Sequence, residues 1–396
     1  SPVTHVPLRA RVERPEATTG AWYALATAPA EDGNSGEPRA LLSADPDAWL
    51  AQVASLGFNV VTLPELSAGV PPTPGSGRVV HPGLGTQSDV LRVVDRARQL
   101  GLDVAIDLGF HGVDGHPYVT AHPEWFRRRP DGTVRHATDA TGRVTLPLDF
   151  EGDAWESLWE ELRRVVSFWV TLGVRVFHAD APDDKPLAFW EWLIAEIHRD
   201  YPEVVFVAGA CERPTRAARL AKIGFTQSVI RLAAPLSQAG VRQAIERAAV
   251  GPAREFTRLH LAVRSPDLAD LDPFGHAAQS IDLVLAATAG DVYRCGDRGL
   301  PDEVESGSLL AIARQLNEVR RTHPAFQLGS RLEFHDTDNP KLVCFSRRAA
   351  LGSARVVIVV NLDAGFMQHG WVAVPAADWG VTGPFDVHDV LREDRQ

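Results

Sequence analysis

The chain has 396 residues, of which 45% are hydrophobic and 23% charged, and its formal net charge is −11. This composition is typical of a globular protein, and the acidic balance argues against nucleic acid as a partner. No apolar run reaches the roughly 18 residues of a membrane span and residues 1–11 lack a signal-peptide pattern, so we expect a soluble, cytoplasmic protein with no membrane partner. The three cysteines have no metal-ligand spacing, so we expect no disulfide, metal or cofactor.

Short apolar strands alternate with amphipathic helices over most of the chain. The predicted strands lie at 21–25, 60–63, 104–108, 174–178, 204–208, 228–230, 259–263 and 292–295. The predicted helices lie at 46–56, 88–100, 154–172, 186–199, 213–223 and 308–321. This alternation is typical of a parallel sheet wrapped by helices, and eight strands in this order favour an α/β fold of the (β/α)8 TIM-barrel type.

The predicted domains follow from where this pattern starts and stops. The barrel is assigned to 21–112 and 150–327, after an N-terminal extension at 1–20. Residues 113–149 form an excursion after the third strand, where barrel enzymes often build a lobe that faces the substrate. From residue 328 to 396, short alternating strands near 332–335, 342–346, 354–361 and 371–374 predict a small C-terminal antiparallel β-sandwich.

Acidic residues follow four of the predicted barrel strands. They are Asp107 after the third strand, Asp180 after the fourth, Glu212 after the fifth and Asp267 after the seventh. In a barrel of this kind the reactive side chains stand at the carboxyl ends of the strands. Acids that converge on one rim suit chemistry at a sugar, with one nucleophile, one proton donor and one group that orients the sugar. An isolated aspartate at a strand end is more often a helix cap, so the prediction depends on their joint placement.

Several runs of residues resemble the GlgE family, the α-1,4-glucan:maltose-1-phosphate maltosyltransferases of glycoside hydrolase family 13 in the α-amylase superfamily. The runs are HPEWF at 122–126, GVRVFHADAP at 173–182, KIGFTQS at 222–228, SPD at 265–267 and LNEVRR at 316–321. The resemblance covers roughly residues 20–392. It implies a retaining enzyme scaffold whose binding partner is a maltooligosaccharide or an α-glucan.

The resemblance assigns roles to three of the acids. Asp180 matches the nucleophile that forms the glycosyl ester, Asp267 matches the acid that orients sugar hydroxyls, and Asp107 matches the structural aspartate of the third strand.

The same comparison shows four departures from the family pattern. The acid/base glutamate of the family falls on Gly209, the arginine two residues before the nucleophile falls on His178, and the following asparagine falls on Ala181. The family's lysine-rich stretch for the donor phosphate falls within 137–144, which contains no lysine. Loss of the proton donor alone slows departure of an alkoxide by about 10²–10⁴-fold. A phosphate leaving group needs less help, but its binding contacts and the base for the acceptor are also missing.

Two functional hypotheses follow. In the first, the chain is a shortened, degenerate pseudoenzyme that binds carbohydrate or supports an active paralogue or a second copy of itself. In the second, it is an active retaining α-glycosidase or transglycosylase with Asp180 as nucleophile and a relocated acid, either Glu212 or His178. Glu212 also suits the start of the next helix, and His178 also suits the space of the lost arginine.

Three further aromatic and histidine residues have two interpretations each. Trp125 could stack on a sugar or fill the core of the lobe, and His111 and His260 could contact a sugar or be structural. The histidines near the rim have no metal-ligand spacing on one element. Trp190 is interpreted as core packing.

Overall fold

The computed structural model describes most of the barrel and of the C-terminal region. The described residues are 21–25, 46–63, 87–114, 116–138, 144–209, 214–232, 236–249, 258–263, 273–297, 308–381, 383 and 388–391.

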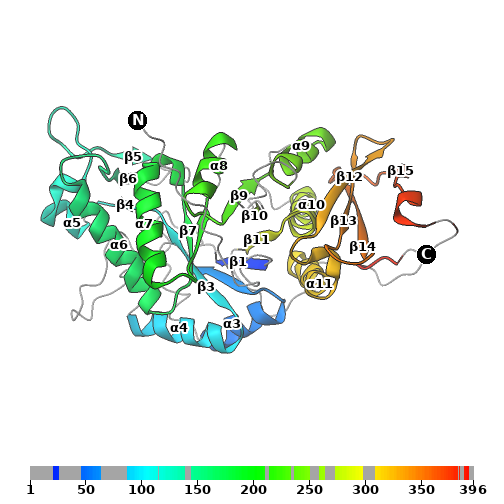
Figure 1. Cartoon of the computed structure of the whole chain (residues 1–396), viewed down its shortest axis with the longest axis horizontal. Helices are drawn as coiled ribbons and strands as arrows, with labels where there is room; N and C mark the ends of the chain where they lie inside the picture. Colours follow the sequence, from blue (N-terminus) through cyan, green and yellow to red (C-terminus); the bar gives the residue numbers. More distant parts are fainter. Residues whose placement is uncertain are drawn as a thin grey trace.

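Eight parallel strands close into a barrel in the order β1-β11-β10-β9-β8-β7-β3-β2 (Figure 1). Their bounds are β1 Ala21–Leu25, β2 Val60–Leu63, β3 Asp103–Leu108, β7 Val176–Ala179, β8 Val205–Ala208, β9 Gln227–Arg231, β10 Arg258–Ala262 and β11 Val292–Asp297. The barrel closes because β1 pairs with both β11 and β2. Each strand overlaps a predicted one, so the (β/α)8 prediction is confirmed.

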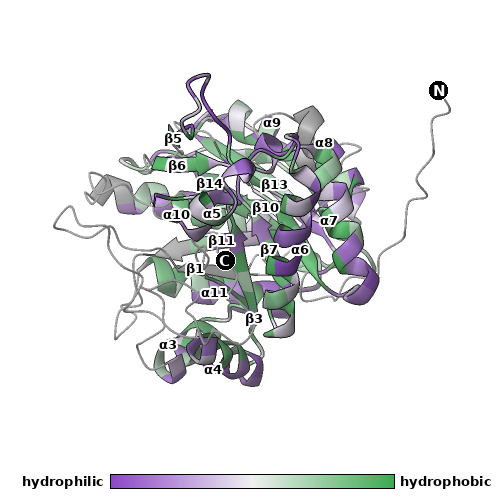
Figure 2. Cartoon of the chain, turned by 90° about the vertical axis from the view of Figure 1, so that its left-hand side faces the viewer, coloured by the Kyte–Doolittle hydropathy of each residue, from purple (hydrophilic) through white to green (hydrophobic). Residues whose placement is uncertain are grey.

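Helices surround the barrel and bury one apolar face each. Their bounds are α3 Pro46–Ser55, α4 Gln87–Gln99, α6 Trp155–Thr171, α7 Leu187–Asp200, α8 Pro214–Lys222, α9 Gln238–Ala249, α10 Pro273–Ala289 and α11 Leu309–Thr322. In α6 the buried residues Leu158, Leu162 and Val165 recur at the helical spacing that places them on one face. Figure 2 shows the result, with hydrophobic colour along β3 and hydrophilic colour on the outer helices. No described helix is long and apolar enough to cross a membrane.

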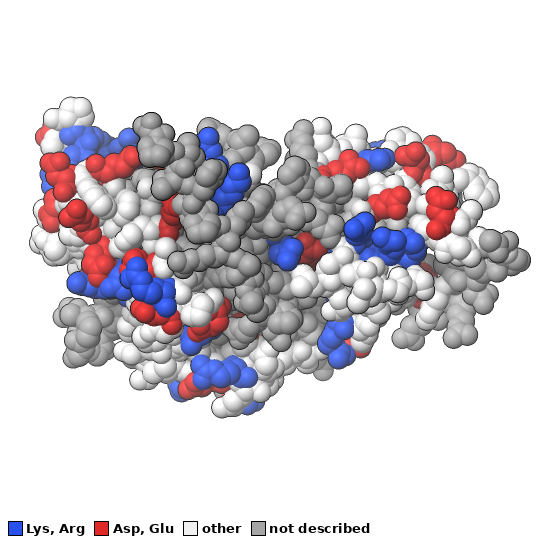
Figure 3. Space-filling view, in the orientation of Figure 1, with Lys and Arg blue, Asp and Glu red and all other residues white. Residues whose placement is uncertain are grey.

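Charged side chains on the visible face of the molecule are mostly interspersed by sign (Figure 3). Many are paired one helical turn apart, as in Arg163 with Glu160 and Arg199 with Glu196. Such exposed pairs contribute only a few tenths of a kcal/mol each.

The inside of the barrel has an apolar layer below a polar one. Inward-pointing small and β-branched side chains form a buried cluster that consists of Val60, Ala105, Val176, Val205, Val207, Val229 and Val292. Two residues further along β3, β7 and β11, side chains that point the same way are Asp107, His178 and Arg294. The alternation of a strand therefore places charged groups directly above the valine layer, at the carboxyl end of the barrel.

A small lobe forms between β3 and α6. It contains β4 His111–Gly112, α5 Pro117–Ala121, η1 Pro123–Trp125, β5 Ala137–Thr138 and β6 Val144–Pro147, with a sheet of order β4-β6-β5.

The C-terminal region contains an antiparallel sheet of order β14-β13-β12-β15, as predicted. The strands are β12 Arg331–Thr337, β13 Leu342–Arg348, β14 Arg355–Asn361 and β15 Val372–Ala373. One face of this sheet joins the barrel core through Val343 and Phe345. Gln238 of α9 also donates hydrogen bonds to Thr337 Oγ1 and Leu342 O.

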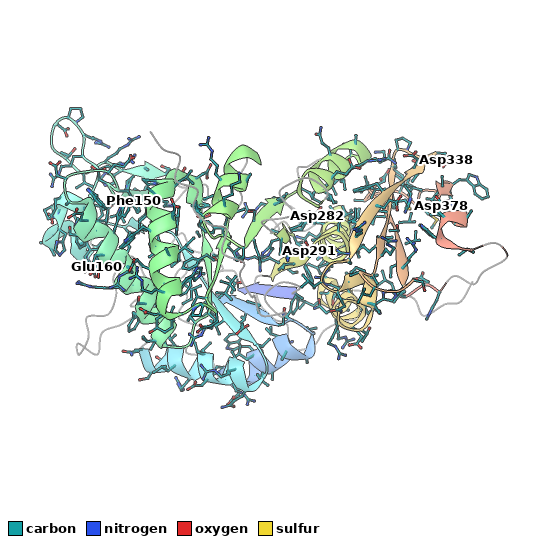
Figure 4. The ribbon with its side chains drawn as sticks, viewed as in Figure 1. Phe150, Glu160, Asp282, Asp291, Asp338 and Asp378 are labelled. Carbon is teal, nitrogen blue, oxygen red and sulfur yellow. The ribbon has the colours of Figure 1, made fainter. Side chains whose placement is uncertain are left out.

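Two buried arginines, one from this sheet and one from α11, bind the end of α10. Arg347 of β13 donates to the carbonyls of Thr288, Ala289 and Gly290 at 3.1–3.2 Å. It also forms an ion pair with Asp291, which follows α10 and is labelled in Figure 4. Arg320 of α11 donates to Ala287 O, Gly290 O and Asp291 O. Burial and the nearby charge of Arg347 lower the pKa of Arg320 to about 10. The two cations are held there because the last carbonyls of a helix are unpaired and carry partial negative charge.

Candidate functional site

Three barrel strands bring Asp107, His178 and Arg294 together at the mouth. Asp107 and His178 lie directly opposite each other on β3 and β7, and their Oδ1 and Nδ1 atoms are 2.8 Å apart. Arg294 reaches across from β11 and donates to Asp107 Oδ2 from Nη2 at 3.3 Å and to Oδ1 from Nη1 at 3.5 Å. His178 and Arg294 therefore converge on the carboxylate of Asp107.

Asp107 is held in its ionised form by these partners. Burial by itself would favour the neutral acid, but the charge of Arg294 and the hydrogen bonds from His178 and Arg294 outweigh it. The pKa of Asp107 falls from 3.8 to about 2. An ionised carboxylate can only accept hydrogen bonds, so Nδ1 of His178 carries the proton between them. This fixes the orientation of the imidazole.

The other ring nitrogen of His178 points toward Gly209. His178 is only 8% exposed, and its Nε2 has no hydrogen-bond partner in the described part of the chain. A Cβ atom built on Gly209 would lie 3.4 Å from that Nε2 and 2.6 Å from the carbonyl oxygen of Ala179. The second distance is below any ordinary contact, and it involves backbone. The position predicted to replace the family's glutamate is thus closed to a side chain unless the backbone moves.

Asp180 stands apart from this cluster. It follows β7 and is exposed, and its carboxylate makes no hydrogen bond or ion pair with the described residues. Its backbone is fixed, since its N–H donates to Leu108 O at 3.0 Å and Lys185 Nζ donates to its carbonyl at 3.2 Å. The main chain of the nucleophile candidate is therefore fixed, but its carboxylate has no charged partner among the described residues. Arg294 and His178 are bound to Asp107 instead.

The residue after Asp180 has a left-handed backbone. Ala181 has φ 40° and ψ 57°, a region that costs a non-glycine residue about 1–2 kcal/mol but that asparagine tolerates. Asparagine is the residue that the family resemblance expected here. Phe110, near the end of β3, also has a positive φ of 49°.

Ala181→Asn is expected to stabilise the protein by about 0.5–1 kcal/mol, because asparagine relieves part of this cost. The measurement is urea denaturation at neutral pH. Ala181→Val is the matched comparison and should destabilise, since a β-branched residue is least tolerant of positive φ. Equal effects of the two substitutions would show that the backbone conformation is not the cause.

The two histidines predicted to lie near the rim, His260 and His111, lie in different parts of the molecule. His260 of β10 is fully buried inside the barrel, where its Nδ1 lies 3.1 Å from Gln227 Oε1. Burial, with the charges of His178 and Arg294, lowers the pKa of His260 well below 6.5. Its imidazole is therefore neutral near neutral pH, and its side chain is enclosed by the barrel. His111 lies partly buried on β4, in the lobe.

Trp125 belongs to the core of the lobe. It is 4% exposed, its indole N–H donates to Ser157 Oγ at 2.9 Å, and the rings of His122 and Tyr118 pack against it. The expectation that it offers a face to a sugar is wrong, since His122 stacks on that ring at 3.9 Å. Trp190 is fully buried and donates to Pro182 O, which confirms its prediction as core packing.

Glu212 and Asp267 lie outside the described residues, so their predicted roles stay predictions. Arg294 and Gln227, which contact Asp107 and His260, are candidate-site residues that the sequence reasoning missed. Arg294 lies two residues after the inward-pointing Val292, and this parity alone indicates an arginine inside the barrel. Among the described residues, no group of three or more His, Cys, Asp and Glu could hold a metal ion.

Solved structures place this architecture in a class. A maltogenic α-amylase from Thermotoga neapolitana superposes with a TM-score of 0.71 over 96% of this chain and 93% of that one, at 17% identity. An α-amylase from Lactobacillus plantarum gives 0.69, 96% and 94%, at 16% identity. The barrel, the lobe after β3 and the C-terminal sheet thus form an α-amylase-type fold.

Sequence comparison narrows the class. A family profile described as "GLGE, C-terminal" matches residues 334–395. Three relatives called α-1,4-glucan:maltose-1-phosphate maltosyltransferase come from Methylacidiphilum infernorum, Myxococcus xanthus and Corynebacterium glutamicum, at 30%, 30% and 32% identity. They match 98%, 97% and 98% of this chain, which spans 66%, 65% and 66% of their lengths. The chain is a GlgE-like member of glycoside hydrolase family 13.

Proposed function

We propose that this protein binds an α-glucan or maltooligosaccharide at the barrel mouth without catalysing maltosyl transfer. The observation that carries the proposal is the closure of position 209, where a Cβ would lie 2.6 Å from Ala179 O. On the predicted assignment, the family's proton donor would have to project from this position. The same closure removes the base that would activate an acceptor hydroxyl.

The surroundings of Asp180 support the proposal. A carboxylate nucleophile attacks efficiently when neighbouring groups hold it ionised and in position. In this mouth Arg294 and His178 are both bound to Asp107, and Asp180 is left exposed. A role beside an active paralogue, or in a complex of two copies, is compatible with such a binding site.

The test combines calorimetry with a turnover assay. We expect maltoheptaose to bind, while incubation with maltose 1-phosphate and glycogen releases no phosphate above a blank. Gly209→Glu is expected not to create turnover, because the new side chain meets the backbone of β7. Phosphate release that disappears in Asp180→Asn would overturn the proposal, and absence of glucan binding would leave only a partner-supporting role.

A second candidate is an active enzyme that uses His178 as its acid or base. The observation that favours it is the buried Nε2 of His178, which faces Gly209 and has no partner in the described part of the chain. An imidazole oriented by a carboxylate at Nδ1 is a common arrangement for proton transfer. In that case a nitrophenyl α-maltoside should be hydrolysed, and His178→Gln should abolish the hydrolysis. If turnover instead depends on Glu212, Glu212→Gln abolishes it and His178→Gln does not.

A further inference from the structure

The register of the C-terminal sheet places three arginines side by side. Arg331 of β12 lies directly opposite Arg348 of β13, and Arg348 lies directly opposite Arg355 of β14. Residues that are directly opposite in an antiparallel sheet point to the same face, with their Cβ atoms about 5 Å apart. We call these three residues the arginine row.

The arginine row stands on the outer face of the sheet. Arg347, the neighbour of Arg348, is the buried residue that bonds the end of α10. Successive side chains of a strand point to opposite faces, so Arg348 points away from the barrel. Arg331 and Arg348 are accordingly exposed, and Arg355 is half-buried.

Among the described residues, no carboxylate forms an ion pair with the arginine row. None of the three side chains makes a hydrogen bond or ion pair with a described residue. Glu333 is the acid of β12 on the same face, one row along, and it forms no ion pair with them. Asp338 follows the opposite end of β12, and Asp378 lies on η5 (Ala377–Trp379), as Figure 4 shows. Like charges placed directly opposite each other destabilise a sheet, and a bound anion would remove that repulsion.

An aromatic ring holds one end of the arginine row. The guanidinium carbon of Arg355 lies 4.9 Å from the centroid of the Trp379 ring. Trp379 also packs edge-on against His335 at 5.6 Å. A guanidinium that lies over an aromatic face keeps its N–H groups available at its edge, and these match two oxygens of a phosphoryl group.

We propose that the arginine row binds a small anion that carries two phosphoryl groups. Three adjacent strands span about 10 Å at the usual strand spacing, so two phosphoryl groups can contact the three guanidinium groups without the side chains having to converge on one point. The chain as a whole is acidic, with net charge −11, so affinity for such an anion must come from local geometry and not from overall charge. The proposal is independent of glucan binding, because the row lies on the C-terminal sheet and the candidate glucan site lies at the barrel mouth.

The test is calorimetric titration with inorganic pyrophosphate at low salt. We expect a dissociation constant of about 1 mM or lower, and at least about tenfold weaker binding in the triple variant Arg331→Gln/Arg348→Gln/Arg355→Gln because charge-assisted bonds are lost. Arg164→Gln/Arg199→Gln/Arg321→Gln is the matched control. It removes the same three charges from exposed helix positions, and it should keep the affinity of the unaltered protein.

A charge variant, a second anion and thermal unfolding test the same proposal independently. Glu333→Gln should tighten pyrophosphate binding, since it removes the negative charge one row away, and orthophosphate should bind more weakly than pyrophosphate. The triple variant should unfold at the same or a higher temperature in the absence of anion, because the repulsion is gone. Equal weakening in both triple variants, no pyrophosphate binding at millimolar concentration, or binding only to anionic lipid vesicles would overturn the proposal.

Discussion

Replacing Arg347 by methionine is expected to lower the free energy of unfolding by about 3–5 kcal/mol, the usual scale for breaking a buried, paired charge. The arginine is 3% exposed and bonds three successive carbonyls at the end of α10, as well as Asp291 and Ser330. Methionine fills much of the volume but leaves these buried acceptors without donors, and each unsatisfied group costs about 1–3 kcal/mol. Loss of the repulsion between Arg347 and Arg320 offsets part of this cost.

Urea denaturation followed by circular dichroism measures this effect. Arg348→Met is the matched control, because it changes the adjacent residue on the same strand but on the solvent side, where substitutions usually stay within about 0.5 kcal/mol. If Arg347→Met and Arg348→Met differ by less than 1 kcal/mol, the arginine does not hold the sheet to α10 in the way described.

Asp107→Asn is expected to destabilise the barrel by about 2 kcal/mol at pH 7. The native pKa of about 2 lies below the unfolded value near 3.8, and each unit of such a shift corresponds to about 1.4 kcal/mol. Because the native pKa is depressed, this stability is fully present above pH 4 and is lost as the pH falls from about 4 to about 2. The substitution also leaves Arg294 without its carboxylate.

The pH dependence distinguishes this charge effect from simple loss of packing. The difference in unfolding free energy between Asp107→Asn and the unaltered protein should shrink toward pH 2. A difference of the same size at pH 7 and pH 2.5 would contradict the assigned ionisation. Asp95→Asn, at an exposed position on α4 where the carboxylate pairs with Arg98, should change stability by less than about 0.5 kcal/mol at both pH values.

Much of the fold could be predicted because its signals are local. The apolar stretches that became β1 and β2 have the predicted bounds, and the helical spacing in α6 was readable from Leu158 to Val165. Asp107 and His178 lie at the ends of strands that are neighbours in the barrel, so their proximity is also a local signal.

Contacts across the barrel could not be predicted in the same way. The link from Arg294 to Asp107 joins residues 187 positions apart, and its formation depends on strand tilt and side-chain reach. The burial of Trp125 depends on His122 stacking over it, which the spacing HPEWF leaves undetermined between a core and a sugar-binding role. The closure at Gly209 depends on a backbone approach to Ala179, and composition carries no signal for it.

The close approach of Gly209 to β7 also limits which residues can arise at position 209 by mutation. A glutamate that arose at this position would meet the carbonyl of Ala179 and lose stability before any gain from proton donation. Selection would therefore remove the first step back toward an acid catalyst unless β7 had already shifted. On the proposed assignment, a glutamate at position 209 could be accommodated only after a shift of β7.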